Sequence, residues 1–228
     1  MDADRVRHDM RGPSITAACL CIIAPMRAKL MSYFLLGLIR VLTGSQARWY
    51  GCPPKAEQRI YFANHQSHAD LVMIWAALPK DLRSRTRAIA ARDYWTKTPF
   101  RQWITTAVFN VIFVARDRSA EEDPLEPLFE ALAQGDSIIL FPEGTRGNAD
   151  LPQPFKAGLY NLACRFPAVE MVPAWINNVQ RVMPKGEVVP VPVLCSVTFG
   201  APIHLDEGEE RRAFLERARN AVIALRDV

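Results

Sequence analysis

Residues 59–78 carry the sequence RIYFANHQSHADLVMIWAAL, in which a short apolar run is followed by a polar loop and a second apolar stretch. The first run, residues 59–63, predicts a buried strand, and residues 67–78 predict a helix. An imidazole, His65, and a carboxylate, Asp70, therefore meet at a strand-to-helix turn. A neutral His65 can take a proton from an attacking hydroxyl if Asp70 orients the ring and stabilises the imidazolium that forms.

The same residues also fit a purely structural role. The pattern Ser67-x-x-Asp70 before an apolar run resembles a capping box, with Ser67 as the N-cap and Asp70 accepting from the first turn. A single His-x4-Asp pattern is a weak signal for catalysis, so both interpretations stay open on these residues alone.

A second polar motif follows residues 137–140, an apolar run that predicts another buried strand. The next seven residues, FPEGTRG at 141–147, form a turn-rich segment with one carboxylate and one guanidinium. Arg146 presents a planar fork of donors that suits a phosphate, and the glycines allow the backbone to approach a ligand closely. The alternative is a surface turn with an ion pair inside the loop.

The charge of the chain is unevenly distributed. The formal net charge is +4, but residues 1–118 hold 18 Lys and Arg against 8 Asp and Glu, whereas the remainder holds 10 against 16. A basic front half suits anionic lipid or a phosphorylated substrate, and no nucleic-acid-binding motif accompanies it. The five cysteines form no Cys-x2-Cys pair and no zinc spacing, which predicts reduced, buried thiols in a cytosolic setting.

Two apolar runs, residues 15–26 and 30–42, lie near the start of the chain and are separated by Arg27 and Lys29. Neither run reaches the ~18 to 20 uninterrupted apolar residues of a spanning helix. A cleaved signal peptide does not fit, because acidic residues accompany the early arginines and no small-x-small site follows. We expect a helical hairpin that enters one leaflet of a membrane, with Arg27, Lys29 and Arg40 near the headgroups. The alternative is an ordinary buried hairpin.

From residue 47 onward, short apolar runs alternate with helical patterns, which is typical of an α/β domain. We therefore divide the chain into an N-terminal membrane-associating segment, 1–46, and a single domain, 47–228. The expected strands are 48–51, 59–63, 87–91, 109–114, 137–141, 169–174 and 193–199. The expected helices are 67–78, 99–107, 124–134, 156–166 and 206–226. Because working loops gather at strand ends in open α/β sheets, we expect both polar motifs at one edge of the sheet.

Together, the two motifs resemble those of the lysophosphatidic acid acyltransferase family (1-acyl-glycerol-3-phosphate acyltransferases) of glycerolipid acyltransferases. Asn64, His65 and Asp70 match its Asn-His-x4-Asp motif, and residues 141–146 match its Phe-Pro-Glu-Gly-Thr-Arg motif in full. Residues 113–116, an apolar run closing on Arg116, and residues 171–176, which contain Val-Pro, resemble its two other motifs. The resemblance covers residues 55–205. This chain departs from it at Gly147, where many members carry Ser, and at Ala174-Trp175 after the Val-Pro.

The resemblance implies a mixed, largely parallel sheet flanked by helices, and attachment to the cytoplasmic face of a membrane. It also implies transfer of an acyl chain from acyl-CoA or acyl-carrier protein to the sn-2 hydroxyl of lysophosphatidic acid, which gives phosphatidic acid without a cofactor. His65 is then the general base and Asp70 its partner. The expected substrate-binding residues are Asn64, Arg116, Glu143, Gly144, Thr145, Arg146 and Lys156. For Lys156, a solvated lysine at a helix start is an equally good interpretation.

Parts of the sequence also suggest three alternatives to this function. His65-x2-His68-x-Asp70 resembles part of a metal site, but only His8 and His204 remain as histidines and neither has a ligand-like setting, so we predict no metal. A non-catalytic lipid-binding protein would have lost some of the motif residues, and all are present. Another acceptor, such as a lyso-aminolipid or a different lysophospholipid, stays open because these enzymes share motifs; Arg146 and Arg116 favour one that bears phosphate.

Overall fold

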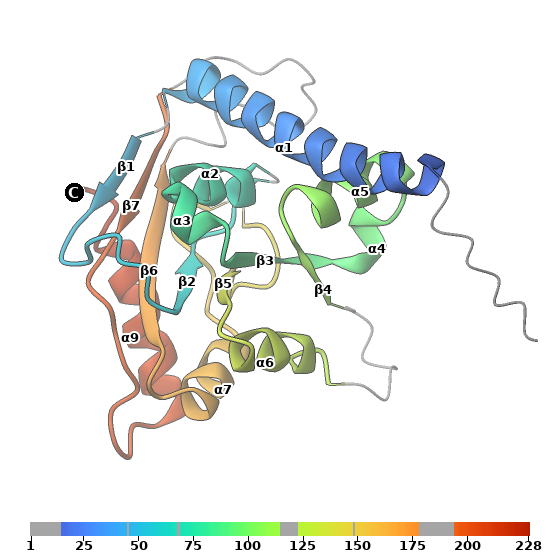
Figure 1. Cartoon of the computed structure of the whole chain (residues 1–228). Helices are drawn as coiled ribbons and strands as arrows, with labels where there is room; N and C mark the ends of the chain where they lie inside the picture. The colour runs from blue at the N-terminus through green and yellow to red at the C-terminus, as the bar shows by residue number, and fades with distance from the viewer. Residues whose placement is uncertain (1–14, 45, 68, 115–122, 148, 178–193) are drawn as a thin grey trace, which may run out of the picture.

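The computed structural model describes residues 15–44, 46–67, 69–114, 123–147, 149–177 and 194–228 (Figure 1). The strands are β1 (Gln46–Trp49), β2 (Arg59–Ala63), β3 (Thr86–Ala91), β4 (Ile112–Val114), β5 (Ser137–Leu140), β6 (Glu170–Asn177) and β7 (Ser196–Phe199). The helices are α1 (Ile15–Thr43), α2 (Asp70–Ala77), α3 (Lys80–Arg83), α4 (Arg92–Trp95), α5 (Pro99–Ala107), α6 (Glu126–Ala133), α7 (Gly158–Arg165) and α9 (Arg211–Ile223).

The strands of the described residues form one sheet in the order β1-β7-β6-β2-β5-β3-β4. The five strands from β6 to β4 are mutually parallel, whereas β7 runs antiparallel to β6 and β1 runs parallel to β7. This is the mixed, largely parallel sheet that the sequence predicted. β2 lies between two parallel neighbours and is buried along its whole length, which is why residues 60–63 are apolar without alternation.

Successive residues of β2 face opposite sides of the sheet. Tyr61 and Ala63 pack in the core formed with α1, α2 and α3. Ile60 and Phe62 pack in the core formed with α6, α7 and α9. Figure 1 shows these two helical layers on either side of the sheet. Each face therefore has its own apolar core. Both cores include side chains of β2, because successive side chains of a strand point to opposite faces of the sheet.

Several predicted boundaries moved for local reasons. The predicted helix at 67–78 begins only at Asp70, because the main-chain N–H groups of Gln66 and Ser67 donate to the Asp70 carboxylate and not to a helical carbonyl. The predicted strand at 109–114 begins only at Ile112, because Asn110 has a φ of 47°, a left-handed conformation foreign to strands. The short helices α3 and α4 were not predicted.

The N-terminal segment differs from the prediction. Both apolar runs lie in one continuous helix, α1, where the sequence predicted a hairpin of two helices. Arg27, Ala28 and Lys29 are good helix formers and continue the helix between the two runs, beyond Pro25 near the end of the first run. No helix of the described residues is both long and apolar enough to cross a membrane.

The part of α1 whose side chains are described has two different faces. Leu36 is buried in the core, with Leu35 and Ile39 packed beside it. Large apolar side chains spaced three or four residues apart are exposed on the other side: Met26, Leu30, Tyr33, Phe34, Leu38 and Val41. We call these six residues the outer stripe of α1. Two of them, Leu30 and Val41, are 71% and 81% exposed, which is unusual for residues of this kind.

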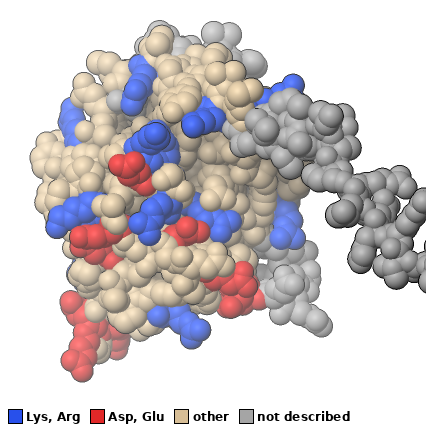
Figure 2. Space-filling model, in the orientation of Figure 1, with Lys and Arg blue, Asp and Glu red and all other residues tan. Residues whose placement is uncertain are grey.

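The distribution of charge follows the asymmetry seen in the sequence. Figure 2 shows Lys and Arg over the upper part and across the middle of the visible face, and acidic residues over the middle and the lower part. The side chains of Cys19 and Cys21 lie outside the described part of the chain, and the other three cysteines are less uniform than predicted. Cys52 and Cys195 are buried, but Cys164 is exposed, because it lies on the outer side of α7.

Candidate active site

The two polar motifs begin side by side. β2 and β5 are adjacent and parallel, and their registers pair Phe62 with Leu140. The loops that follow them, from Asn64 and from Phe141, therefore leave the same edge of the sheet. This confirms the expectation that both motifs lie at one edge, which had rested on the strand pattern alone.

His65 and Asp70 form a direct pair at this edge. Nδ1 of His65 lies 2.9 Å from Oδ2 of Asp70, whose carboxylate is 1% exposed. A carboxylate only accepts, so Nδ1 carries the proton and the lone pair of the neutral imidazole lies on Nε2. No other described residue forms a hydrogen bond to Nε2, and the His65 side chain is 21% exposed. The ring can therefore meet a ligand through that nitrogen.

The Asp70 carboxylate also orders the loop that precedes its helix, α2. The same Oδ2 accepts from the main-chain N–H groups of Gln66, at 2.6 Å, and Ser67, at 2.7 Å, while Ser67 Oγ accepts from the N–H of Ala69. The capping-box interpretation is wrong, because α2 begins at Asp70, its N-cap is Ala69, and no described side chain accepts from its first turn. The loop N–H groups of Gln66 and Ser67 fix the carboxylate, and the fixed carboxylate orients His65.

The FPEGTRG segment holds His65 from the other sides. The ring of Phe141 stacks on the imidazole, with centroids 4.3 Å apart and planes inclined by 17°. The Glu143 carboxylate accepts from the His65 N–H at 2.7 Å, and the His65 carbonyl accepts from the Gly147 N–H at 2.8 Å. One neighbouring loop therefore holds His65 at its ring and at the peptide groups on both sides of its Cα.

Glu143 and Asn64 differ from the roles expected of them. Glu143 is 2% exposed, and its second oxygen accepts from the N–H of Gln153 at 2.8 Å. Burial raises the pKa of the Glu143 carboxyl, and the N–H donors of Gln153 and His65 oppose that shift. Asn64 is 1% exposed and uses its amide to donate to and accept from the main chain of Ile176 on β6. Both side chains are thus engaged with the protein backbone, where substrate contact had been expected.

Three consecutive residues of the segment are exposed. Gly144, Thr145 and Arg146 lie at the surface, and Lys156 approaches them from the start of the α7 region. A Cβ added to Gly144 would lie 2.5 Å from Lys156 Nζ, so the ammonium lies directly over this glycine. Arg116 and His68 lie outside the described residues. No ion pair of Arg146 or Lys156 is found in the described part of the chain, which leaves both cations available to a ligand at this loop.

Some contributions could not be found from the sequence. Gln153 acts through its main-chain N–H, which every residue except proline carries, so no side-chain pattern marks it. Phe141 belonged to a recognised motif, but its stacking on His65 depends on the adjacency of β2 and β5. That adjacency is a tertiary fact, and no local pattern encodes it.

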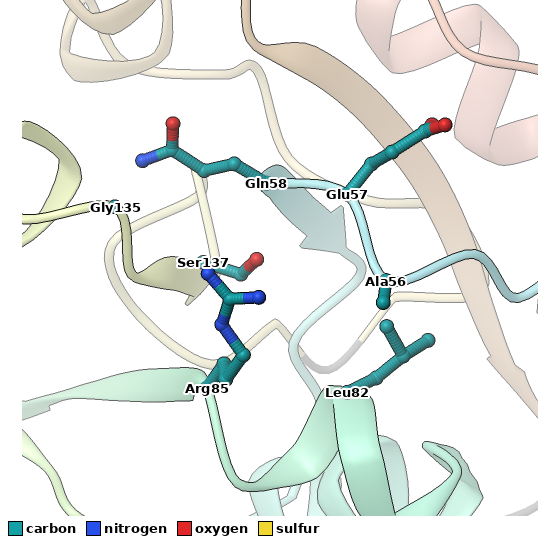
Figure 3. Close-up of a pocket in the computed structure, with 7 residues that line it drawn as sticks. All are labelled: Ala56, Glu57, Gln58, Leu82, Arg85, Gly135 and Ser137. Atoms are coloured by element: carbon teal, nitrogen blue, oxygen red, sulfur yellow. The ribbon is translucent and has the colours of Figure 1, made fainter.

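A depression at the opposite edge of the sheet lies among Glu57, Gln58, Arg85 and Ser137, where β2 and β5 begin (Figure 3). It is separated from His65 by the length of β2, and its lining includes no histidine. Within the described ranges, no group of three or more His, Cys, Asp or Glu side chains could hold a metal ion.

Comparison with known proteins places this geometry in context. The sequence profile of the Acyltransferase family matches residues 52–177, more than half of the chain. A 1-acyl-sn-glycerol-3-phosphate acyltransferase of Cocos nucifera is 31% identical over 160 residues, which cover 67% of this chain and 48% of that protein. The alpha form of Homo sapiens is 27% identical over 180 residues, covering 75% and 60% respectively. The chain thus spans less than two thirds of the length of these curated relatives.

A solved structure shares the fold. The 1-acyl-sn-glycerophosphate (LPA) acyltransferase PlsC from Thermotoga maritima superposes with a TM-score of 0.63 at 22% identity, over 89% of this chain and 86% of that one. The profile match includes both motif loops and the strands that carry them. The chain therefore belongs to the acyltransferase family.

Proposed function

We propose that this protein is a 1-acylglycerol-3-phosphate O-acyltransferase that converts lysophosphatidic acid into phosphatidic acid, with acyl-CoA or acyl-carrier protein as donor. One observation carries the proposal: His65 has its Nδ1 fixed by Asp70 and its Nε2 open, directly beside an exposed loop with two cations. The names of the curated relatives support the same reaction.

The chemistry follows from this arrangement. The sn-2 hydroxyl oxygen attacks the thioester carbonyl carbon while its proton passes to Nε2 of His65. The tetrahedral intermediate collapses, the carbon–sulfur bond breaks, and the departing thiolate takes the proton back from the imidazolium. Asp70 stabilises that imidazolium and preserves its orientation. A thioester is already activated, so positioning and a base are sufficient and no covalent acyl-enzyme is needed.

The acceptor is expected to bring a phosphate to Arg146 and Lys156. A guanidinium gives two parallel hydrogen bonds to phosphate oxygens, and an ammonium adds a point charge. Gly144 and Thr145 directly precede Arg146 in the sequence and lie at the surface, which suits close approach of a ligand to the backbone. Arg116 remains a proposed further contact. A lysolipid without phosphate would leave these cations without their natural counter-ion.

A membrane surface is the expected source of the acceptor and the place where the product is left. The outer stripe of α1 and the exposed Arg27, Lys29 and Arg40 suit a helix that lies in the headgroup region of an anionic leaflet. We accordingly propose that residues 1–46 attach the domain formed by 47–228 to the cytoplasmic face of a membrane.

The deciding experiment is acyl transfer from labelled long-chain acyl-CoA to a panel of lysophospholipids in vesicles. Wild type, His65→Ala and His204→Ala should be compared, since His204 is an exposed histidine outside the site. We expect product with lysophosphatidic acid, a rate reduced on the order of 10²- to 10⁴-fold in His65→Ala, and no change in His204→Ala. Product only with another acceptor would change the substrate, and wild-type turnover by His65→Ala would refute the mechanism.

A further inference from the structure

The Glu143 carboxylate joins two segments that are far apart in the sequence. Oε1 accepts from the N–H of His65 at 2.7 Å, and Oε2 accepts from the N–H of Gln153 at 2.8 Å. The side chain is 2% exposed. Among the described residues it forms no ion pair, so Arg146, three residues later, does not neutralise it. Both oxygens are therefore committed to main-chain donors.

We infer that Glu143 is a positioning residue for the general base, and that it acts through the protein backbone without touching the acceptor. The inference rests on the proposed function, because it assigns Glu143 a role in the same site. It replaces the expectation that Glu143 lies around the acceptor phosphate. A buried carboxylate with both oxygens occupied has no group left to offer a ligand, and its negative charge would repel a phosphate.

The contacts explain why a carboxylate is needed at this position. A carboxylate only accepts, and it can satisfy two N–H groups that point at it from opposite sides. Glutamine has the same shape but carries one acceptor and one donor. In Glu143→Gln, one of the two N–H groups would face another donor and stay unpaired in a buried place. Glu143→Gln is therefore expected to impair the positioning of His65, although the substitution is conservative. If Glu143 only contacted the substrate, the same substitution should be tolerated.

The hydrogen bonds from His65 and Gln153 to Glu143, which we call the clamp, also leave little space around the carboxylate. A Cβ added to Gly147 would lie 3.3 Å from Glu143 Oε2 and 3.5 Å from the Gln153 side-chain nitrogen. Gly147 in turn donates its N–H to the carbonyl of His65. The segment that contains Lys156 has an anchor of its own, because the Lys156 N–H donates to the Pro142 carbonyl at 2.9 Å. Loss of Glu143 should therefore disturb His65 more than the cations.

The first test compares kcat and KM for lysophosphatidic acid in wild type, Glu143→Gln and Glu130→Gln. Glu130 is an exposed glutamate of α6 and serves as the matched control. We expect kcat of Glu143→Gln to fall roughly 10- to 100-fold, as small displacements of a catalytic group do. Its KM should stay within about 3-fold of wild type, and Glu130→Gln should behave as wild type. A raised KM with kcat unchanged would overturn the inference and return Glu143 to the acceptor site.

A second measurement does not depend on activity. Amide hydrogen exchange, followed in peptides that contain His65 or Gln153, should accelerate in Glu143→Gln at both segments and at neither in Glu130→Gln. If wild type transferred no acyl chain, the proposed function would fail while this measurement still tested the clamp. Unchanged exchange at both segments in folded Glu143→Gln would contradict the clamp itself.

Discussion

Nδ1 of His65 and Oδ2 of Asp70 lie 2.9 Å apart, and that same oxygen accepts from the N–H groups of Gln66 and Ser67. One oxygen atom thus orders the loop before α2 and orients the proposed base. The capping box that the sequence also allowed is not formed, because the N-cap of α2 is Ala69 and no described side chain accepts from the first turn. The loop-ordering role and the catalytic role of Asp70 can be separated by a change that removes one role and keeps the other.

Asp70→Asn is that change. An asparagine can place its carbonyl oxygen where Oδ2 lies and still accept from all three N–H groups, but it brings no negative charge. We expect thermal stability close to wild type and a kcat reduced on the order of 10²-fold or more, because the imidazolium loses its counter-ion. Asp70→Ala should lose activity and also unfold at lower temperature, because two main-chain donors lose their acceptor. Equal melting temperatures for the two variants would contradict this division of roles.

Gly144 offers a test of the proposed phosphate site. Its φ is +68°, and Lys156 lies over it, whereas Gly135 has a φ of +86° with no atom near an added Cβ. Alanine at either position should cost about 1–3 kcal/mol of stability from backbone strain alone. Only Gly144→Ala should also displace the Lys156 ammonium and raise KM for lysophosphatidic acid. Gly135→Ala is therefore the matched control for strain.

The same argument makes Lys156→Met informative. The methionine keeps much of the aliphatic side chain and removes the charge, so KM should rise on the order of 10-fold with kcat nearly preserved. Combining Lys156→Met with Gly144→Ala should raise KM little further, since both changes remove the same contact. If Lys156→Met left KM unchanged in the steady-state assay, Lys156 would be the ordinary solvated lysine that the sequence also allowed.

Much of this architecture could be predicted because local signals were strong. β2 and α5 occupy the predicted ranges 59–63 and 99–107, one marked by a continuous apolar run and the other by Thr98 as N-cap before a proline. The edge location of both motifs followed from the strand pattern. The four-residue helices α3 and α4 escaped prediction because one turn is too short to display a period.

The roles of individual polar side chains were harder to predict. Asn64 and Glu143 were expected at the substrate, yet both bond to the main chain. Asn64 bonds to Ile176, 112 residues away in sequence. Glu143 accepts from His65 and Gln153, which are 78 and 10 residues away. The residue type determines which hydrogen bonds a side chain can donate or accept. The direction in which the side chain points depends on which strands become neighbours. The α1 helix posed a similar problem, since a pattern of apolar runs does not say where one helix stops.

The outer stripe of α1 predicts a measurable affinity for lipid. Leu30→Glu with Val41→Glu places two charges on the exposed apolar face without touching Leu36, which is buried in the core. Each lost apolar contact is worth about 1–2 kcal/mol, so co-sedimentation with anionic vesicles should fall by at least ~10-fold. Val228→Glu, at an exposed apolar residue away from α1, is the control. Unaltered sedimentation of the double variant would exclude this face as the membrane contact.

The buried thiol of Cys195 predicts how stability depends on alkaline pH. Burial raises its pKa from 9.0 to about 11, so the folded protein holds the proton more tightly than the unfolded chain does. The unfolded state therefore loses this proton first as pH rises, and the free energy of unfolding should fall between about pH 9 and 11. Chemical denaturation across this range should show a smaller fall in Cys195→Ala than in wild type. Cys164→Ala removes an exposed thiol and should keep the wild-type slope; identical slopes for all three proteins would show that Cys195 does not titrate in this way.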